Sequence, residues 1–277
     1  MKTWTLRLIL WSLPLLLLAQ PAHAWGLYTH TYFAQLLLTA VPLSEPAFRL
    51  AARHFPRLVM AGASLPDLAL LAGWLKTPAF RHSHEWPLLQ QMLRSERTEH
   101  QAIALGFASH LLVDVIAHHH FVPEHEHRWF DWPVVTHALC EWAMDRHLQP
   151  KLRARPGELL QRERATLAPF VSQHFGCDIQ VADRALRQLA SADQGLRRGR
   201  LPGVIYRASR RLDSMLQRRF DDYLQATASH LPDINRLIAG HTPLLHANGS
   251  SSPNPQKRDA NLLPGSLFVQ LVTADMR

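Results

Sequence analysis

Residues 98–119, TEHQAIALGFASHLLVDVIAHH, decide how the rest of this 277-residue sequence is interpreted. Its apolar side chains recur every three to four positions, which is the spacing of an α-helix: Ile103, Phe107, Leu111 and Val115. Within this apolar stretch His110 and Asp114 stand four positions apart, so they project from the same face. A buried histidine and a buried aspartate are costly unless they are paired or bind a metal. The stretch therefore predicts a core helix that carries chemistry.

The rest of the sequence also favours helices. Seven further segments show helical apolar spacing: 32–40, 47–55, 87–94, 134–147, 158–174, 181–191 and 206–228. Proline and glycine mark the connections between them, as in 155–157 and 201–203. With 47% apolar and 19% charged residues, the composition excludes an intrinsically disordered chain. We expect an all-α protein, a single multi-helix domain with a metal cluster in its helical core.

The first 24 residues are expected to be a secretory signal peptide. Lys2 and Arg7 precede an apolar run of 12 residues at 8–19, which is too short to span a bilayer. Ala22-His23-Ala24 fits a small-x-small cleavage site. Cleavage after Ala24 would place the mature protein in the periplasm or outside the cell.

Beyond the signal, residues 25–247 are expected to form the helical domain, and residues 248–277 a polar linker with a short tail. With only 2 cysteines, the sequence does not favour a disulfide scaffold or a thiolate metal cluster, although Cys140 and Cys177 could form one disulfide. Histidine is abundant at 18 residues, so imidazole ligands are well supplied.

A second His–carboxylate pair strengthens the prediction of a metal site. His137 and Glu141 repeat the four-residue spacing of His110 and Asp114 inside the predicted helix 134–147. His120 follows His110 by ten residues, near enough on the helix end to face the same pocket. Two helices that each present a histidine and a carboxylate inward are typical of metal sites in helical bundles. Nitrogen and oxygen donors without thiolate suit zinc, with iron or manganese as alternatives.

Three motifs upstream add donors, and together the motifs carry a resemblance. In chain order they are WGLYTH (25–30), GASLPD (62–67), RHSH (81–84), GFASHLLVDVIAHHH (106–120) and HALCE (137–141). This series resembles the zinc-dependent phospholipase C family, whose fold is shared with the zinc-dependent single-strand-specific nucleases. The resemblance covers residues 25–142.

The resemblance implies three zinc ions and assigns each candidate donor residue to one of them. Trp25, as the mature N-terminus, and His30 would bind one ion. Asp67, His82, His110 and Asp114 would serve another, with Asp114 bridging the two and His84 as the alternative to His82. The third ion would be held by His120, His137 and Glu141. Asp67 would also act as the catalytic proton acceptor; no substrate-binding residue is assigned.

The activity implied is hydrolysis of the glycerol-side phosphodiester of phospholipids at a membrane surface, giving diacylglycerol and a phosphorylated head group. No protein partner is predicted. Two alternatives remain: a zinc-dependent nuclease or other phosphodiesterase on the same scaffold, with nucleic acid as its partner, and a non-catalytic zinc- or lipid-binding periplasmic protein. The chain carries a net charge of +8, and the basic stretch 184–219 could attract anionic lipid or nucleic acid or form a solvated helix face.

Overall fold

A computed structural model describes residues 26–122, 133–243, 245 and 247, with the side chains of 133–137 left out. The described residues form helices and no strand, which confirms the predicted all-α class. The expected signal peptide (1–24) and the whole of the expected linker and tail (248–277) lie outside the described residues.

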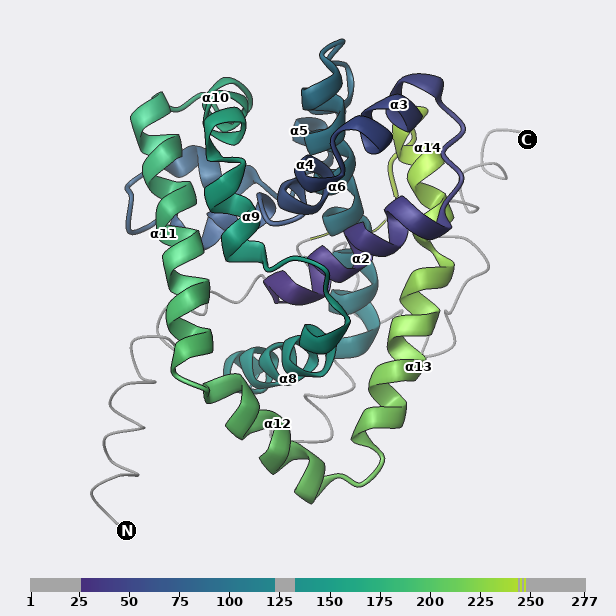
Figure 1. Cartoon of the computed structure of the whole chain (residues 1–277), viewed down its shortest axis with the longest axis vertical. Coiled ribbons are helices and arrows are strands. Elements are labelled where there is room, and N and C mark those ends of the chain that lie inside the picture. Colours follow the sequence, from purple (N-terminus) through teal and green to yellow (C-terminus); the bar gives the residue numbers. More distant parts are fainter. Residues whose placement is uncertain (1–25, 123–132, 244, 246, 248–277) are drawn as a thin grey trace, which may run out of the picture.

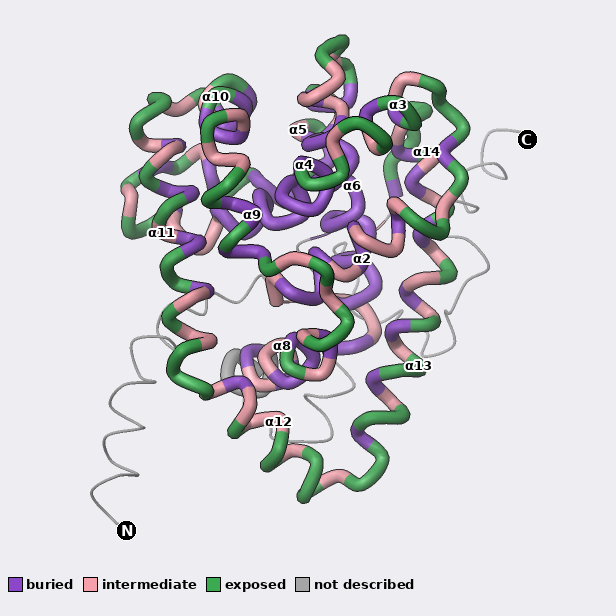
Figure 2. Tube along the Cα trace, viewed as in Figure 1, coloured by how far each residue is buried: buried purple, intermediate pink, exposed green. Residues whose placement is uncertain are grey.

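Helix α6 (Thr98–Ile116) runs through the middle of the molecule (Figure 1). It packs against α2 (Leu27–Ala40), α3 (Pro46–His54), α4 (Pro56–Gly62) and α5 (Trp86–Leu93). Figure 2 shows α4 and α6 as the most continuously buried part of the trace. Residues 98–121 are long and apolar enough to cross a membrane, but most of them are buried inside the protein, as expected of a core helix.

The remaining elements surround this centre. In chain order they are η1 (Pro66–Leu71), η2 (Pro78–His82), η3 (Ala117–Phe121), α8 (Pro133–Leu148), η4 (Gln149–Lys151), α9 (Pro156–Arg162), α10 (Arg164–Phe175), α11 (Ile179–Arg198), α12 (Leu201–Leu212), α13 (Leu216–Ser229), η5 (Leu231–Asp233) and α14 (Ile234–Ile238). Helices α11 and α13 flank the molecule, and α12 joins them beside α8 (Figure 1). The segment η3 is a π-helix that continues α6, a feature often found at functional sites.

Two glycines let α4 and α6 approach until their backbones touch. A Cβ atom added to Gly106 would lie 1.9 Å from the carbonyl oxygen of Val59, and one added to Gly62 would lie 2.3 Å from that of Ile103. Real Cβ atoms do not come this close to backbone atoms, so a larger residue at either position would push the helices apart. This close approach places the end of α4 directly against His110, one of the candidate metal ligands on α6.

Several helices begin at a proline that the sequence suggested was part of a loop. Pro156 and Pro202 stand in the first turns of α9 and α12. Proline fits there because the first helical N–H groups have no acceptor within the helix. For the same reason Pro56 begins α4, a helix that the apolar spacing did not predict.

Two segments predicted as single helices are each divided in the structure. The segment 158–174 breaks at Glu163, so that α9 packs on α4 while α10 packs on α5. The segment 206–228 breaks at Asp213, whose Oδ1 accepts a hydrogen bond from the backbone N–H of Met215 at 3.0 Å. Such a side-chain turn competes with the helix for its backbone donors. Cys140 and Cys177 are not joined by a disulfide.

A buried histidine pair in the core is expected to make the fold sensitive to acid. His174 of α10 packs on Phe170 and lies 5.8 Å, between ring centroids, from His100 of α6. Burial, with a smaller contribution from the neighbouring His100, lowers the pKa of His174 to about 4. The unfolded chain therefore binds this proton from about pH 6.5 downward, whereas the folded protein resists it until about pH 4.

The variant His174→Phe should therefore lose less stability than the wild type when the pH falls from 6.5 to 4. Urea unfolding midpoints measured at several pH values in this window check the expectation. His54→Phe, at an exposed position on α3, is the matched control and should leave the pH dependence unchanged. Equal slopes for wild type and His174→Phe would contradict it.

Candidate metal centre

Five side chains that are able to coordinate a metal ion, from four parts of the chain, meet in the core. Each is buried, and together they supply imidazole nitrogens and carboxylate oxygens: His30 on α2, Asp67 on η1, His84 between η2 and α5, and His110 and Asp114 on α6. They form two overlapping groups whose donor atoms lie within 4.8 Å of one another, His30–Asp67–His110 and His84–His110–Asp114. The spacing of the α6 pair therefore marked the centre of the cluster.

Asp114 divides its two oxygens between two sides of the cluster. Its Oδ1 lies 3.3 Å from Nε2 of His30, while its Oδ2 lies 3.0 Å from Nε2 of His110 and 3.3 Å from Nε2 of His84. The rings of His30 and His110 stack with centroids 3.5 Å apart. One carboxylate thus faces imidazoles that come from three separate segments.

The orientation of His110 is set by the close approach of α4 and α6. Its Nδ1 lies 2.8 Å from the carbonyl oxygen of Ala63, which can only accept, so Nδ1–H donates. Nε2 is then the nitrogen turned toward Asp114 and His84. Metal-binding histidines are held in this way, with one ring nitrogen hydrogen-bonded to the protein and the other left for the ion.

His84 is oriented by the same device. Ser83 donates its hydroxyl hydrogen to the carbonyl oxygen of Pro66 at 2.7 Å, so its oxygen accepts from Nδ1 of His84 at 3.1 Å. This leaves Nε2 of His84 directed at Asp114. Ala63 and Pro66 in GASLPD and Ser83 in RHSH are not predicted ligands. Their hydrogen bonds instead orient His110 and His84.

His82, placed in the ligand set by the sequence motif, does not join this cluster. Its side chain is 65% exposed and pairs with Glu85, with Nδ1 2.6 Å from Oε1. His84 takes its place, because the turn after η2 directs the second histidine of the motif inward and the first outward. The motif favours His82 and keeps His84 as the alternative, because sequence spacing does not show which of the two side chains turns inward.

The electrostatics of the two aspartates differ sharply. Burial by itself would raise the pKa of Asp114, but His110 and His30 outweigh it and hold this pKa well below its usual value. Burial raises the pKa of Asp67 to about 8, helped by Asp114 and Glu141 and opposed by His110. Negative charge is therefore concentrated where the imidazoles converge.

This donor set fits zinc. Imidazole nitrogen and carboxylate oxygen are among the ligands that zinc takes in proteins, and a buried carboxylate is stabilised when it coordinates a cation. Oδ2 of Asp67 is buried and accepts no hydrogen bond within the described residues. A cation near it would satisfy that atom and offset the cost of burying the cluster's charge.

The remaining predicted ligands are only partly described. His120 is half-buried in η3, and burial lowers its pKa, with His119 and His230 adding to the effect. Glu141 is partly buried on α8 and close enough to Asp67 to raise its pKa. Trp25 and the side chain of His137 lie outside the described residues, so their part in the site stays a prediction.

A buried ion-pair network fixes the helix that carries His30. Asp145 of α8 accepts hydrogen bonds at Oδ1 from the backbone N–H and the hydroxyl of Thr29, at 3.0 and 2.9 Å. A carboxylate at the first turn of α2 both caps it and complements its dipole. Arg197 of α11 pairs with Asp145 and with Asp193, and its guanidinium lies 4.0 Å from the ring centroid of Tyr28.

The network also accounts for Gly26. A Cβ atom at this position would lie 2.3 Å from Oδ2 of Asp145, so only glycine fits against the carboxylate. Gly26, Tyr28 and Thr29 belong to the WGLYTH motif, whereas Asp145, Asp193 and Arg197 lie outside every motif that the sequence analysis named. Two features of the sequence hint at this network. They are an acidic residue, Asp145, inside the predicted helix 134–147, and a glycine, Gly26, next to the expected mature N-terminus.

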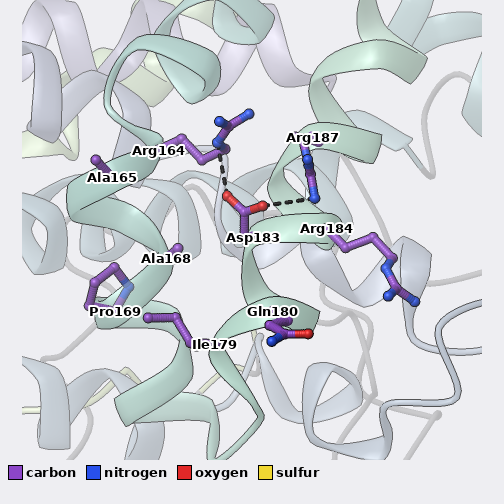
Figure 3. A pocket seen from close by; sticks show the side chains of 9 residues that line it. All are labelled: Arg164, Ala165, Ala168, Pro169, Ile179, Gln180, Asp183, Arg184 and Arg187. Atoms are coloured by element: carbon purple, nitrogen blue, oxygen red, sulfur yellow. Dashed lines mark ion pairs between the residues drawn. The ribbon is translucent and has the colours of Figure 1, made fainter.

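A surface cavity lies apart from the cluster, between α10 and α11, and has a volume of about 470 Å³. In Figure 3, Asp183 reaches between Arg164 and Arg187, to which it is 2.8 and 2.9 Å away. Part of the cavity's positive charge is thereby neutralised, and none of its lining residues belongs to the predicted ligand set.

The two histidines of the RHSH motif can be separated by mutation. We expect His84→Ala to lower the bound zinc by about one ion per chain, because it removes an oriented imidazole from the cluster. His82→Ala is the matched control, two residues away and exposed, and should retain the wild-type zinc content. Elemental analysis of both purified variants is the measurement; loss of zinc from His82→Ala alone would contradict the placement.

The comparison with protein families agrees with the motifs. A family model described as zinc dependent phospholipase C matches residues 29–197. The match spans more than half of the chain, includes all five residues of the cluster, and extends past the motifs into α9, α10 and α11. No curated protein and no solved structure matches the chain. With a family match over this length and the buried donors in place, the chain belongs to the zinc-dependent phospholipase C family.

Proposed function

We propose that the protein is an exported phospholipase C that cleaves the glycerol-side phosphodiester of phospholipids at a membrane surface. The observation that carries the proposal is the convergence of five buried donors, from four segments, in a chain of the zinc-dependent phospholipase C family. The products would be diacylglycerol and a phosphorylated head group.

The division of Asp114 between two sides supports more than one ion. His30 and Oδ1 of Asp114 would serve one ion, together with the amine and carbonyl oxygen of Trp25. His84, His110, Asp67 and Oδ2 of Asp114 would serve a second. We propose a third ion held by His120, His137 and Glu141.

Bound zinc would supply an acidified water at neutral pH and positive charge for the phosphate oxygens. In the displacement a water oxygen adds to phosphorus, the bond from phosphorus to the glycerol oxygen breaks, and that oxygen takes up a proton. Asp67 is proposed to accept the proton of the attacking water, since its Oδ2 is buried in the cluster and accepts no hydrogen bond from described groups. Asp114, held ionised by the imidazoles, keeps the negative charge of the site fixed.

Zinc content and a substrate panel on the same preparation test the proposal. We expect release of phosphorylated head groups from phospholipid, its loss after chelation and its recovery when zinc is restored. No release from any head group would reject the phospholipase. Digestion of single-stranded DNA or RNA instead would assign the nuclease alternative, and bound zinc without any turnover would assign the non-catalytic one.

Export is proposed from the composition of residues 1–24. Mass spectrometry of the N-terminus of protein recovered from the periplasm or medium should give a chain that begins at Trp25. A chain that keeps residues 1–24 and stays in the cell would contradict export while leaving the family unaffected.

A further inference from the structure

The corner formed by α12 and the start of α13 exposes large apolar side chains beside arginines. Of the large apolar residues exposed in the described chain, Val204, Leu212 and Met215 fall within this short stretch, at 47%, 81% and 47% exposure. Val204, Ala208 and Leu212 are spaced by four, so they form one stripe along α12. Arg207 and Arg211 lie next to the stripe, three and seven positions after Val204.

Contacts on the opposite face hold this stripe outward. Helix α12 packs on α8, and Pro202 in its first turn is buried. The hydroxyl of Tyr206 lies 2.9 Å from Nδ1 of His147 and accepts a hydrogen bond from Gln217 at 3.2 Å. The rotation of α12 about its axis is therefore set, and the exposure of Leu212 follows from that rotation.

The charge on the corner is positive and mostly uncompensated. Helix α12 contains three arginines and no acidic residue. Within the described residues Arg207, Arg211 and Arg218 take part in no ion pair, and Arg210 lies over the ring of Tyr206. The neighbouring acid, Asp213, is already paired with Arg219.

An apolar stripe flanked by arginines on a fixed helix is the arrangement that binds in the plane of a membrane interface. The apolar side chains enter the boundary of the acyl chains while the arginines meet anionic head groups. A protein partner that buried the stripe would gain nothing from the row of unpaired arginines unless it were itself acidic. The charge therefore favours a lipid surface.

We propose that Val204, Ala208 and Leu212, with Arg207 and Arg211, dock the protein on an anionic phospholipid surface, with α12 parallel to it. This rests on the proposed function, in which the substrate is a membrane phospholipid. Because α12 packs on α8, docking places α8 on the side of the molecule that faces the lipid (Figure 1).

Vesicle sedimentation tests the docking, and a soluble substrate tests the site separately. The variants are Val204→Ser with Leu212→Ser, and Arg207→Gln with Arg211→Gln. Helix α3 lies away from α12 (Figure 1) and offers a matched control, Leu50→Ser with Arg53→Gln, which also removes an exposed apolar residue and an exposed arginine. Vesicles contain either phosphatidylcholine alone or phosphatidylcholine with about a third phosphatidylserine.

We expect the wild type and the α3 control to bind anionic vesicles at least tenfold more tightly than neutral ones. The serine variant should lose at least tenfold in binding to anionic vesicles, and the glutamine variant should lose the preference for anionic lipid and its salt dependence. Hydrolysis of a monomeric short-chain phospholipid, with circular dichroism, shows that each variant is folded.

Three results would overturn the docking. The first is unchanged vesicle binding by the serine variant, and the second is an equal loss of vesicle binding by the α3 control. The third is a dimer of the wild type in the absence of lipid that Leu212→Ser dissociates, which would make the corner a contact between two copies of the chain. If neither the wild type nor any variant hydrolyses the soluble substrate, the proposed function fails, while vesicle binding still decides whether the corner docks on lipid.

Discussion

Asp114→Asn is expected to lose bound zinc and activity together while the helices persist. The substitution removes the one negative charge shared by both sides of the cluster and replaces one oxygen by an N–H donor. That donor would face Nε2 of the surrounding imidazoles, where an ion is expected. We expect at least one zinc ion per chain to be lost. Activity should fall by more than the roughly 10–100-fold caused by substitution of an outer partner of a metal ligand.

Elemental analysis, turnover and circular dichroism on one preparation check this result. Asp222→Asn makes the same chemical change at an exposed position on α13 and should behave as the wild type. Full zinc content with full activity in Asp114→Asn would show that the cluster is only a buried hydrogen-bonded group.

Gly106→Val is expected to destabilise the centre of the protein. The first atom of the new side chain would lie 1.9 Å from the carbonyl oxygen of Val59 and 2.9 Å from the N–H nitrogen of Ala63. Both neighbours are backbone, so α4 and α6 must separate. We expect the free energy of unfolding to fall by at least about 3 kcal/mol. At roughly 2–4 °C per kcal/mol for a domain of this size, the Tm would fall by about 6–12 °C or more.

The same change should also lower zinc affinity, because the carbonyl of Ala63 that orients His110 would move with α4. Gly195→Ala is the control, since nothing lies within 4 Å of an added Cβ atom on that part of α11. Alanine there should stabilise the helix by about 0.4–1 kcal/mol. A Gly106→Val protein as stable as the wild type would show that the two helices do not need their close approach.

Proline accounts for most of the difference between the helices expected from the sequence and those observed. The residue is a helix breaker in an interior and a good starter in a first turn, and apolar spacing alone does not tell these roles apart. The sequence pattern therefore predicts loops at Pro156 and Pro202, although both residues stand in the first turns of α9 and α12. The break at Asp213 in the predicted helix 206–228 also has a local cause. There a turn closed by the Asp213 side chain interrupts an apolar pattern that is otherwise continuous.

The sequence by itself determined the helical class, the family and four of the five cluster residues. His110 and Asp114 could be recognised because a spacing of four on one apolar helix fixes their common face without knowledge of any other segment. His30 and Asp67 followed from motifs whose order along the chain is itself informative.

Only the tertiary structure decided between His82 and His84, and only it revealed the residues that hold the ligands. Which histidine of a short motif turns inward depends on a hydrogen bond from Ser83 to the carbonyl of Pro66, seventeen residues away. The support of α2 by Asp145 and Arg197 joins segments more than a hundred residues apart in the chain. Local spacing carries no information about such contacts, because they arise when separate helices pack and bury one another's polar groups.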